Sequence, residues 1–211
     1  MAQDTAPVPV ESFELVGGRI CLDFTNTVGN YLGVQRGEDR DKIVDYDDLL
    51  IFARRVGALD EAARQALVRE ATGRPKDAER VLGQARQLRR AIFDLLHPDA
   101  ERAAREAALA VVDRAVAAAR AREHLRAEGE GFVFALEADG AALDRPLWPI
   151  ALSAAEVLTS PALARVRGCD HETCTWLFVD ESKNQSRRWC TMRDCGNRVK
   201  AKRHYDKKRA G

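Results

Sequence analysis

The stretch from residue 169 to residue 198 reads CDHETCTWLFVDESKNQSRRWCTMRDCGNR. Four cysteines in it follow the pattern C-x4-C-x15-C-x4-C, namely Cys169, Cys174, Cys190 and Cys195. Two close pairs of thiolates can converge on one tetrahedral ion, and four thiolates are the ligand set of a closed structural zinc site. We therefore expect these cysteines to bind one zinc ion and to leave no coordination position open for a substrate.

Two other uses of four cysteines stay open at this stage. An iron–sulfur cluster also takes four cysteines, but the spacing matches none of the ferredoxin patterns. A redox disulfide switch is the second alternative. It is disfavoured because we expect a cytoplasmic protein, with no secretory signal and no membrane span, and cytosolic cysteines are normally reduced.

The residues between the two cysteine pairs favour a hairpin followed by a helix. We expect strands over 176–179 and 187–189, joined by a turn at 181–186. Cys190 would then end the second strand, and Cys195 would lie in the first turn of the terminal helix. A knuckle, a hairpin and a helix in this order are typical of a treble-clef zinc module.

Charge is distributed unevenly along the chain. The net formal charge is only +1. Residues 165–211 nevertheless contain 13 Lys and Arg against 6 Asp and Glu, whereas the rest of the chain contains 21 against 27. This asymmetry indicates a basic C-terminal module attached to an acidic body. So short a segment buries little apolar surface, so metal binding would supply much of its stability.

The terminal helix carries most of the positive charge of the module. A helix that is polar on every side is not built to pack into its own core, but it suits the phosphates of a nucleic acid. The simpler alternative is a solvated end of the chain. The residues that we expect to contact nucleic acid are Arg187, Arg188, Arg198, Lys200, Lys202, Arg203, Lys207 and Lys208.

DNA is the expected partner, with two alternatives. The chain lacks the aromatic pattern of an RNA-recognition motif, but an arginine-rich helix also suits RNA. A zinc-stabilised protein-interaction module would use the hairpin instead of the helix. A single DNA-binding module buries only ~600–1,000 Å² of protein surface, so a homodimer that brings two fingers together is a further hypothesis.

The sequence before the cysteines indicates an α+β fold that is mostly helical. We expect a flexible tail at 1–11, a domain at 12–160 and the zinc finger at 165–211. Hydrophobic residues at helical spacing predict helices over 45–56, 77–96 and 149–158. Asp60 can cap a further helix that ends near Gly73, and Asp99 can cap an alanine-rich helix that reaches about Glu123. Ser160 and Pro161 end the last helix, and we place the domain boundary there.

Two short hairpins are expected in the N-terminal domain. The first joins residues 13–16 to 19–24 through Gly17 and Gly18, because apolar and polar residues alternate over 19–24. The second joins residues 132–136 to a short apolar return through Asp139-Gly140, a pair that suits a tight hairpin turn.

Three polar residues at the end of the first hairpin could contact a small-molecule effector: Asp23, Asn26 and Thr27. The same side chains could instead cap a turn through local hydrogen bonds. We find no phosphate-binding glycine loop, no H-E-x-x-H motif and no nucleophile elbow. We therefore expect no catalytic residues and no enzymatic activity, and we expect this domain to sense an effector or to dimerise.

Two stretches of the chain resemble a known pair of bacterial domains. Cys190-x4-Cys195-Gly196-Asn197-Arg198, with the first cysteine pair, resembles the CGNR zinc finger. Residues 18–27, GRICLDFTNT, are similar to the opening of the ABATE domain. Proteins with both domains are classed as stress-induced transcription regulators. The resemblance implies zinc at the four cysteines and nucleic-acid contact from the residues that follow Cys195.

Overall fold

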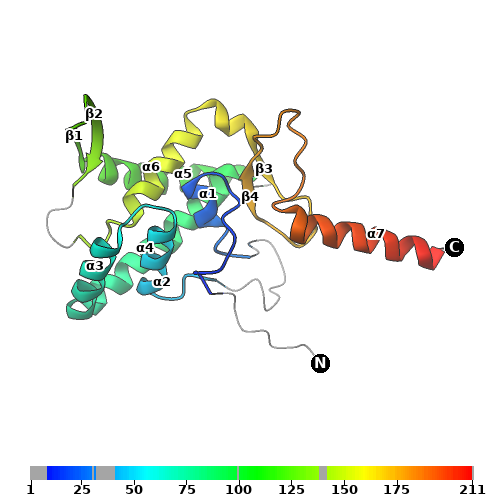
Figure 1. Cartoon of the computed structure of the whole chain (residues 1–211), viewed down its shortest axis with the longest axis horizontal. Coiled ribbons are helices and arrows are strands. Elements are labelled where there is room, and N and C mark those ends of the chain that lie inside the picture. The colour runs from blue at the N-terminus through cyan, green and yellow to red at the C-terminus, as the bar shows by residue number, and fades with distance from the viewer. Residues whose placement is uncertain (1–8, 30, 32–40, 99, 138–141, 211) are drawn as a thin grey trace.

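The computed structural model describes residues 9–29, 31, 41–98, 100–137 and 142–210. The protein is α+β, with a mostly helical body, short antiparallel hairpins and a C-terminal helix that extends away from the body (Figure 1). Its helices are α1 (Ile20–Thr25), α2 (Tyr46–Arg55), α3 (Glu61–Gly73), α4 (Pro75–Leu96), α5 (Arg102–Arg120), α6 (Leu147–Leu158) and α7 (Asn197–Ala210). Strand β1 (Glu123–Glu128) pairs with β2 (Gly131–Leu136), and β3 (Val166–Gly168) pairs with β4 (Leu177–Val179). A 3-10 turn, η2 (Pro161–Arg165), and a π-helical turn, η3 (Met192–Gly196), precede β3 and α7 respectively.

The helices predicted from hydrophobic spacing are confirmed. Helix α2 begins after Asp45, whose carboxylate accepts a hydrogen bond from the Asp48 backbone N–H at 2.9 Å. It ends before Gly57, which has φ of +74°, a conformation that glycine adopts at little cost. Asp60 caps α3 in the same way as Asp45 caps α2. Helix α4 begins two residues earlier than predicted and ends, as predicted, at Leu96.

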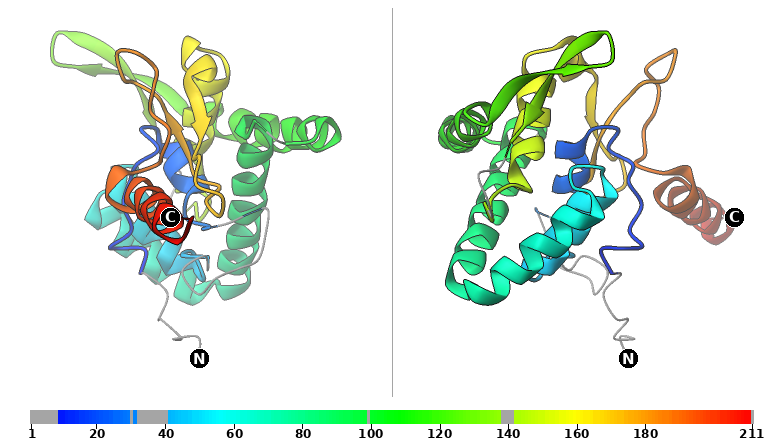
Figure 2. Two further views of the ribbon diagram at one scale, coloured as in Figure 1. Left: turned by 90° about the vertical axis from the view of Figure 1, so that its right-hand side faces the viewer. Right: turned by 60° about the vertical axis from the view of Figure 1, so that its left-hand side comes forward.

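The hydrophobic core lies around α4, the longest helix of the body. Its buried side chains include Val81, Leu88 and Ile92, and it packs against α1, α2, α3, α5 and α6. Ile150 and Ala154 of α6 are fully buried in the same core. The right-hand view in Figure 2 shows α7 outside this helical body. No helix among the described residues is both long and apolar enough to cross a membrane.

The first predicted hairpin is wrong, because residues 20–25 form helix α1. The residues from Cys21 to Thr25 are all buried between α4, α6 and β4. Since its polar residues are buried as well as its apolar ones, the alternation of the two kinds does not indicate a half-buried strand. The Thr25 hydroxyl donates to the Leu22 carbonyl at 2.7 Å, which satisfies this polar side chain inside the core.

The second hairpin exists, but its partner strand was predicted wrongly. Strand β2 pairs with β1, the segment before it, and the turn lies at Gly129 and Glu130. Helix α5 therefore ends at Arg120 instead of reaching Glu123, where β1 begins. The predicted turn at Asp139-Gly140 and the predicted cap at Asp99 lie outside the described residues.

The zinc-finger segment also pairs differently from the prediction. Strand β4 pairs with β3, which precedes the first cysteine, and residues 187–189 do not form a strand. The chain turns after β4 because the Asp180 carboxylate accepts hydrogen bonds from the Ser182 and Arg187 backbone N–H groups at 2.9 and 3.0 Å. Cys195 lies in η3, the turn immediately before α7.

The zinc-finger segment packs against the helical body. Val166, Leu177 and Val179 belong to the main hydrophobic core. Of the predicted tail at 1–11, residues 1–8 lie outside the described part, whereas Val10 is buried in the main core. The chain segments on the two sides of the predicted boundary are therefore in direct contact, and their division into domains stays a prediction.

Candidate metal centre and nucleic-acid interface

The four cysteines come together at one point. Cys169 follows β3, Cys174 precedes β4, Cys190 ends the long loop after β4, and Cys195 lies in η3. Their Sγ atoms all lie within 4.8 Å of one another. The Sγ atom of Cys190 is 3.9 Å from that of Cys174 and 3.5 Å from that of Cys195. A zinc tetrahedron with Zn–S bonds of about 2.3 Å places its sulfur atoms roughly 3.8 Å apart, so this cluster fits one zinc ion.

Backbone hydrogen bonds hold the two cysteine pairs in place. The Cys190 N–H donates to the Cys169 sulfur at 3.3 Å, and the Cys174 N–H donates to the His171 carbonyl at 2.9 Å. Gly196 follows the last cysteine, and a Cβ atom there would lie 2.6 Å from the Met192 sulfur. A larger residue after Cys195 would therefore require the flexible, partly exposed side chain of Met192 to move.

The thiols affect one another's ionisation. Hydrogen bonds from the neighbouring thiols stabilise the thiolate of Cys169 and so lower its pKa. The Cys169 thiolate in turn raises the pKa of Cys174 and of Cys190. Four adjacent thiols therefore cannot all ionise unless a cation balances their charge. A zinc ion supplies that charge, and with four thiolates it has no open position for a reacting water. The site is suited to a structural role.

Arg187 was predicted to contact nucleic acid, but its guanidinium contacts an aromatic ring and three backbone carbonyls of the protein itself. It lies over the Phe178 ring, 4.0 Å from the ring centroid. It also donates to the backbone carbonyls of Val16 at 3.0 Å, Cys190 at 2.5 Å and Trp189 at 3.2 Å. The arginine thus connects the metal site to the segment before α1. Its sequence neighbours, Ser186 and Arg188, gave no signal of this role.

Helix α7 forms a basic arm that leaves the body directly after the metal site (Figure 1). Four of its predicted nucleic-acid contacts are exposed and form no ion pair with another described residue: Lys200, Arg203, Lys207 and Lys208. Three other predicted contacts are exposed but pair with carboxylates. Arg188 lies 2.6 Å from Asp170, Arg198 lies 2.7 Å from Asp194, and Lys202 lies 3.0 Å from Glu172.

The side chains of two of the three predicted effector contacts, Asn26 and Thr27, form hydrogen bonds within the fold. The Asn26 side-chain amide donates to the Leu177 carbonyl at 2.9 Å, and its oxygen accepts from the Leu177 N–H at 2.8 Å. Asn26 therefore joins α1 to β4 across 151 residues of sequence. The Thr27 hydroxyl donates to the Phe24 carbonyl at 2.7 Å and accepts a hydrogen bond from Arg89 at 2.7 Å.

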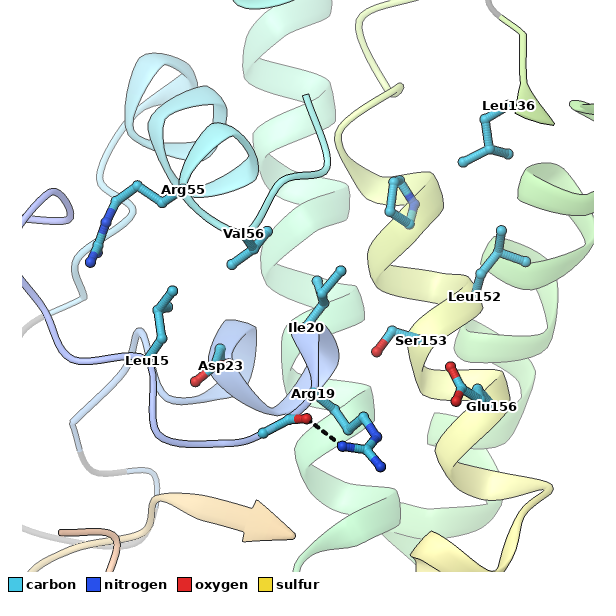
Figure 3. A pocket seen from close by; sticks show the side chains of 12 residues that line it. Leu15, Arg19, Ile20, Asp23, Arg55, Val56, Leu136, Leu152, Ser153 and Glu156 are labelled. Atoms are coloured by element: carbon cyan, nitrogen blue, oxygen red, sulfur yellow. Dashed lines mark hydrogen bonds between the residues drawn. The ribbon is translucent and has the colours of Figure 1, made fainter. Parts of the chain in front are cut away.

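Asp23, the third predicted contact, lines a surface groove of about 640 Å³ between α1, the end of α2 and α6 (Figure 3). Apolar walls include Leu15, Ile20 and Leu152, and Glu156 adds an exposed carboxylate. Burial raises the pKa of Asp23 to about 6, although the Gly17 N–H donates to its carboxylate at 2.8 Å. Sequence reasoning missed the other groove residues because it placed Ile20 on a strand.

The segment before α1 lies between this groove and the zinc finger. The Val179 N–H of β4 donates to the Gly17 carbonyl at 2.9 Å. Arg19 lines the groove and forms an ion pair with Glu181 at 3.0 Å. Residues 16–19, which we call the connecting segment, therefore contact both the groove and the loop that carries Cys190.

Comparison with known families agrees with this geometry. The CGNR zinc finger family matches residues 165–208, the segment that holds all four cysteines and nearly all of α7. The ABATE family, described as "putative stress-induced transcription regulator", matches residues 18–161. A comparison with curated proteins found no match. The second family covers more than half of the chain. The chain therefore belongs to the ABATE family and ends in a CGNR zinc finger.

Proposed function

We propose that this protein is a DNA-binding transcription regulator in which the zinc site aims the basic arm α7 at the phosphates of a duplex. One observation carries the proposal: α7 starts two residues after a zinc ligand, and four of its predicted nucleic-acid contacts are exposed and form no ion pair with another described residue. Residues 197–210 contain seven Lys and Arg and one acidic residue, Asp206. A helix of 14 residues is about 21 Å long, which is enough to contact several phosphates.

The zinc ion has a positional role in this proposal, and no catalytic step is assigned to the protein. Zinc would hold the loop at Cys190 and the turn at Cys195, so that α7 leaves the body in one direction. Phosphate contacts set the position of a protein on DNA but do not read its sequence. Recognition of a specific site would need further contacts with base edges.

The salt dependence of binding tests the DNA proposal. If four cations contact phosphates, the logarithm of the affinity for duplex DNA should fall with the logarithm of salt concentration with a slope near −3.6, at about −0.9 for each contact. Fluorescence anisotropy between 50 and 300 mM salt would measure this slope. Absence of binding at low salt would contradict the proposal and favour a protein-interaction module. Tighter binding to RNA of the same length would favour the RNA alternative.

We also propose that the N-terminal domain senses a small molecule in the groove at Asp23. The groove supports this role because the connecting segment at 16–19 contacts both the groove and the zinc-finger loop. A ligand that moved this segment would therefore change the support of the DNA-binding arm. This coupling would make DNA affinity depend on the ligand.

A thermal-shift screen tests the sensing proposal. We expect at least one compound of a metabolite library to raise the melting temperature of the wild-type protein. The substitution Leu152→Trp, which fills the groove, should abolish that shift. The matched control Leu163→Trp changes an exposed leucine outside the groove and should retain the shift. A shift that persists in Leu152→Trp would place the ligand elsewhere.

A further inference from the structure

Asp23, in the groove beside α1, is a buried carboxylate that forms no ion pair with another described residue. The residue is only 7% exposed, and its Oδ1 atom accepts a hydrogen bond from the Gly17 N–H at 2.8 Å. A buried charge without a counter-charge destabilises a fold, and titratable groups in such surroundings are typical of binding sites. Asp23 is therefore placed to receive a positive group from outside the protein.

The two arginines that line the same groove already have partners within the protein. Arg19 forms an ion pair with Glu181 of the zinc-finger loop at 3.0 Å. Arg55 donates to the Phe13 carbonyl at 2.9 Å, and its guanidinium lies 5.6 Å from the centroid of the Phe13 ring. Figure 3 shows the Arg55 side chain pointing away from Glu156. Neither arginine is therefore free to bind a negative group in the groove.

The rest of the groove combines a second carboxylate with apolar walls. Glu156 of α6 is exposed and forms no ion pair with another described residue. Figure 3 shows Ile20 between Asp23 and Glu156. The volume of about 640 Å³ falls within the roughly 300–1,000 Å³ of small-molecule sites. The apolar lining comes from α1, α2, α6, β2 and the segment before α1: Leu15, Ile20, Val56, Leu136, Pro149 and Leu152.

We propose that the groove binds an amphipathic organic cation, whose ammonium group contacts Asp23 and whose apolar part lies on Ile20 and Leu152. This names the ligand class of the proposed sensing role and therefore rests on that role. An ammonium has three donors and no acceptor, so it suits the lone pairs of a carboxylate. Glu156 adds negative potential on the α6 side. Since the Gly17 N–H donates to the same Asp23 carboxylate, the bound cation would act directly on the connecting segment.

Binding of such a cation should depend on pH. Burial raises the pKa of Asp23 to about 6, although the charges of Arg55 and Arg187 lower it. The other charged groups that line the groove are Arg19 and Glu156. Below this pKa the carboxyl is protonated and no longer attracts an ammonium. Because only about a tenth of Asp23 is ionised at pH 5, a cation should bind about tenfold more weakly there than at pH 7.5.

Three probes with the same apolar chain and different head groups test the proposal: octylammonium, octanol and octanoate. Isothermal titration calorimetry at pH 7.5 should show that the wild-type protein binds octylammonium at least tenfold more tightly than the other two. The variant Asp23→Asn keeps an oxygen that can accept the Gly17 N–H, so its melting temperature and zinc content show whether it is folded. It should bind octylammonium no more tightly than octanol, and equally at pH 5 and pH 7.5. Leu152→Trp should weaken the binding of all three probes.

A variant of the exposed carboxylate keeps the test independent of the buried one. Glu156→Gln should weaken octylammonium binding and leave octanol binding unchanged, because it removes only charge. The matched control Glu70→Gln changes an exposed glutamate of α3 outside the groove and should bind octylammonium as the wild type does. Octylammonium affinity that is unchanged in both Asp23→Asn and Glu156→Gln would overturn the proposal.

The three probes also separate the ligand class from the sensing role. Tighter binding of octanol or octanoate than of octylammonium, abolished by Leu152→Trp, would reject a cation but retain the groove as a sensor. If none of the three probes binds, the cation proposal is wrong, and the thermal-shift screen with the metabolite library then decides whether the sensing role falls with it.

Discussion

Replacing Cys190 by serine is expected to eliminate zinc binding and to unfold the finger. Cys190 is only 2% exposed, and its sulfur lies within 4 Å of two other ligand sulfurs. Beside it, the small core of the finger contains Phe178 and Cys195 as its other buried members. So small a core cannot hold a loop of this length, and structural zinc in peptides contributes about 10–16 kcal/mol of apparent binding free energy. We therefore expect zinc content to fall from one equivalent to none.

Elemental analysis and protease sensitivity would measure this result. New cleavage should appear in residues 180–196, while the helices of the body stay protected, because β3 and β4 pack in the main core. Cys21→Ala is the matched control. Cys21 is fully buried in the main core and its pKa is raised to about 12 by burial, so it is a hydrophobic residue and no metal ligand. One zinc equivalent in Cys190→Ser would contradict the assignment of the site.

Removing four charges from the basic arm is expected to reduce DNA affinity on the order of 10³-fold at 0.15 M salt, from the counterion release of four phosphate contacts. The variant changes to glutamine the four predicted contacts on α7 that form no ion pair with another described residue: Lys200, Arg203, Lys207 and Lys208. Glutamine keeps the helix propensity of these positions, so the melting temperature and the zinc content should not change. The slope of log affinity against log salt should become less negative by roughly 3.6.

A second variant separates the arm from the net charge of the protein. It removes the same number of exposed cations from the helical body by changing them to glutamine: Arg69, Lys76, Arg102 and Arg114. If the arm binds DNA, this control should bind within a few-fold of the wild type. Equal losses in the two variants would mean that binding depends on overall charge and would count against the arm as the interface.

Features that depend on neighbours along the chain could be predicted from the sequence. The spacing of the four cysteines predicted one cluster because each pair closes a short turn of its own. The helices α2 and α4 followed from one-sided hydrophobic spacing, and α3 followed from the cap at Asp60. The high content of lysine and arginine after Cys195 could be found by counting residues.

Features that depend on contacts between distant residues could not be predicted from the sequence. Helix α1 has only six residues, all but the first of them buried, and burial on every side removes the periodic pattern from which helices and strands are distinguished. Strand β4 has two candidate neighbours of similar length, and only the packing of Val166 and Val179 in the main core selects β3. The exposure of Phe132 and Phe134 could not be predicted either, because an apolar strand is normally assumed to face a core.

The sequence by itself determined which residues bind the metal, which helices form the body and where positive charge accumulates. Ligand type, helical periodicity and charge are properties of residues and their near neighbours. Only the tertiary structure decided that Asn26 holds β4, that Arg187 joins the metal site to Val16, and that residues 16–19 connect the groove to the finger. Each of these contacts joins residues more than 150 positions apart, so its partner can be identified only once the chain has folded.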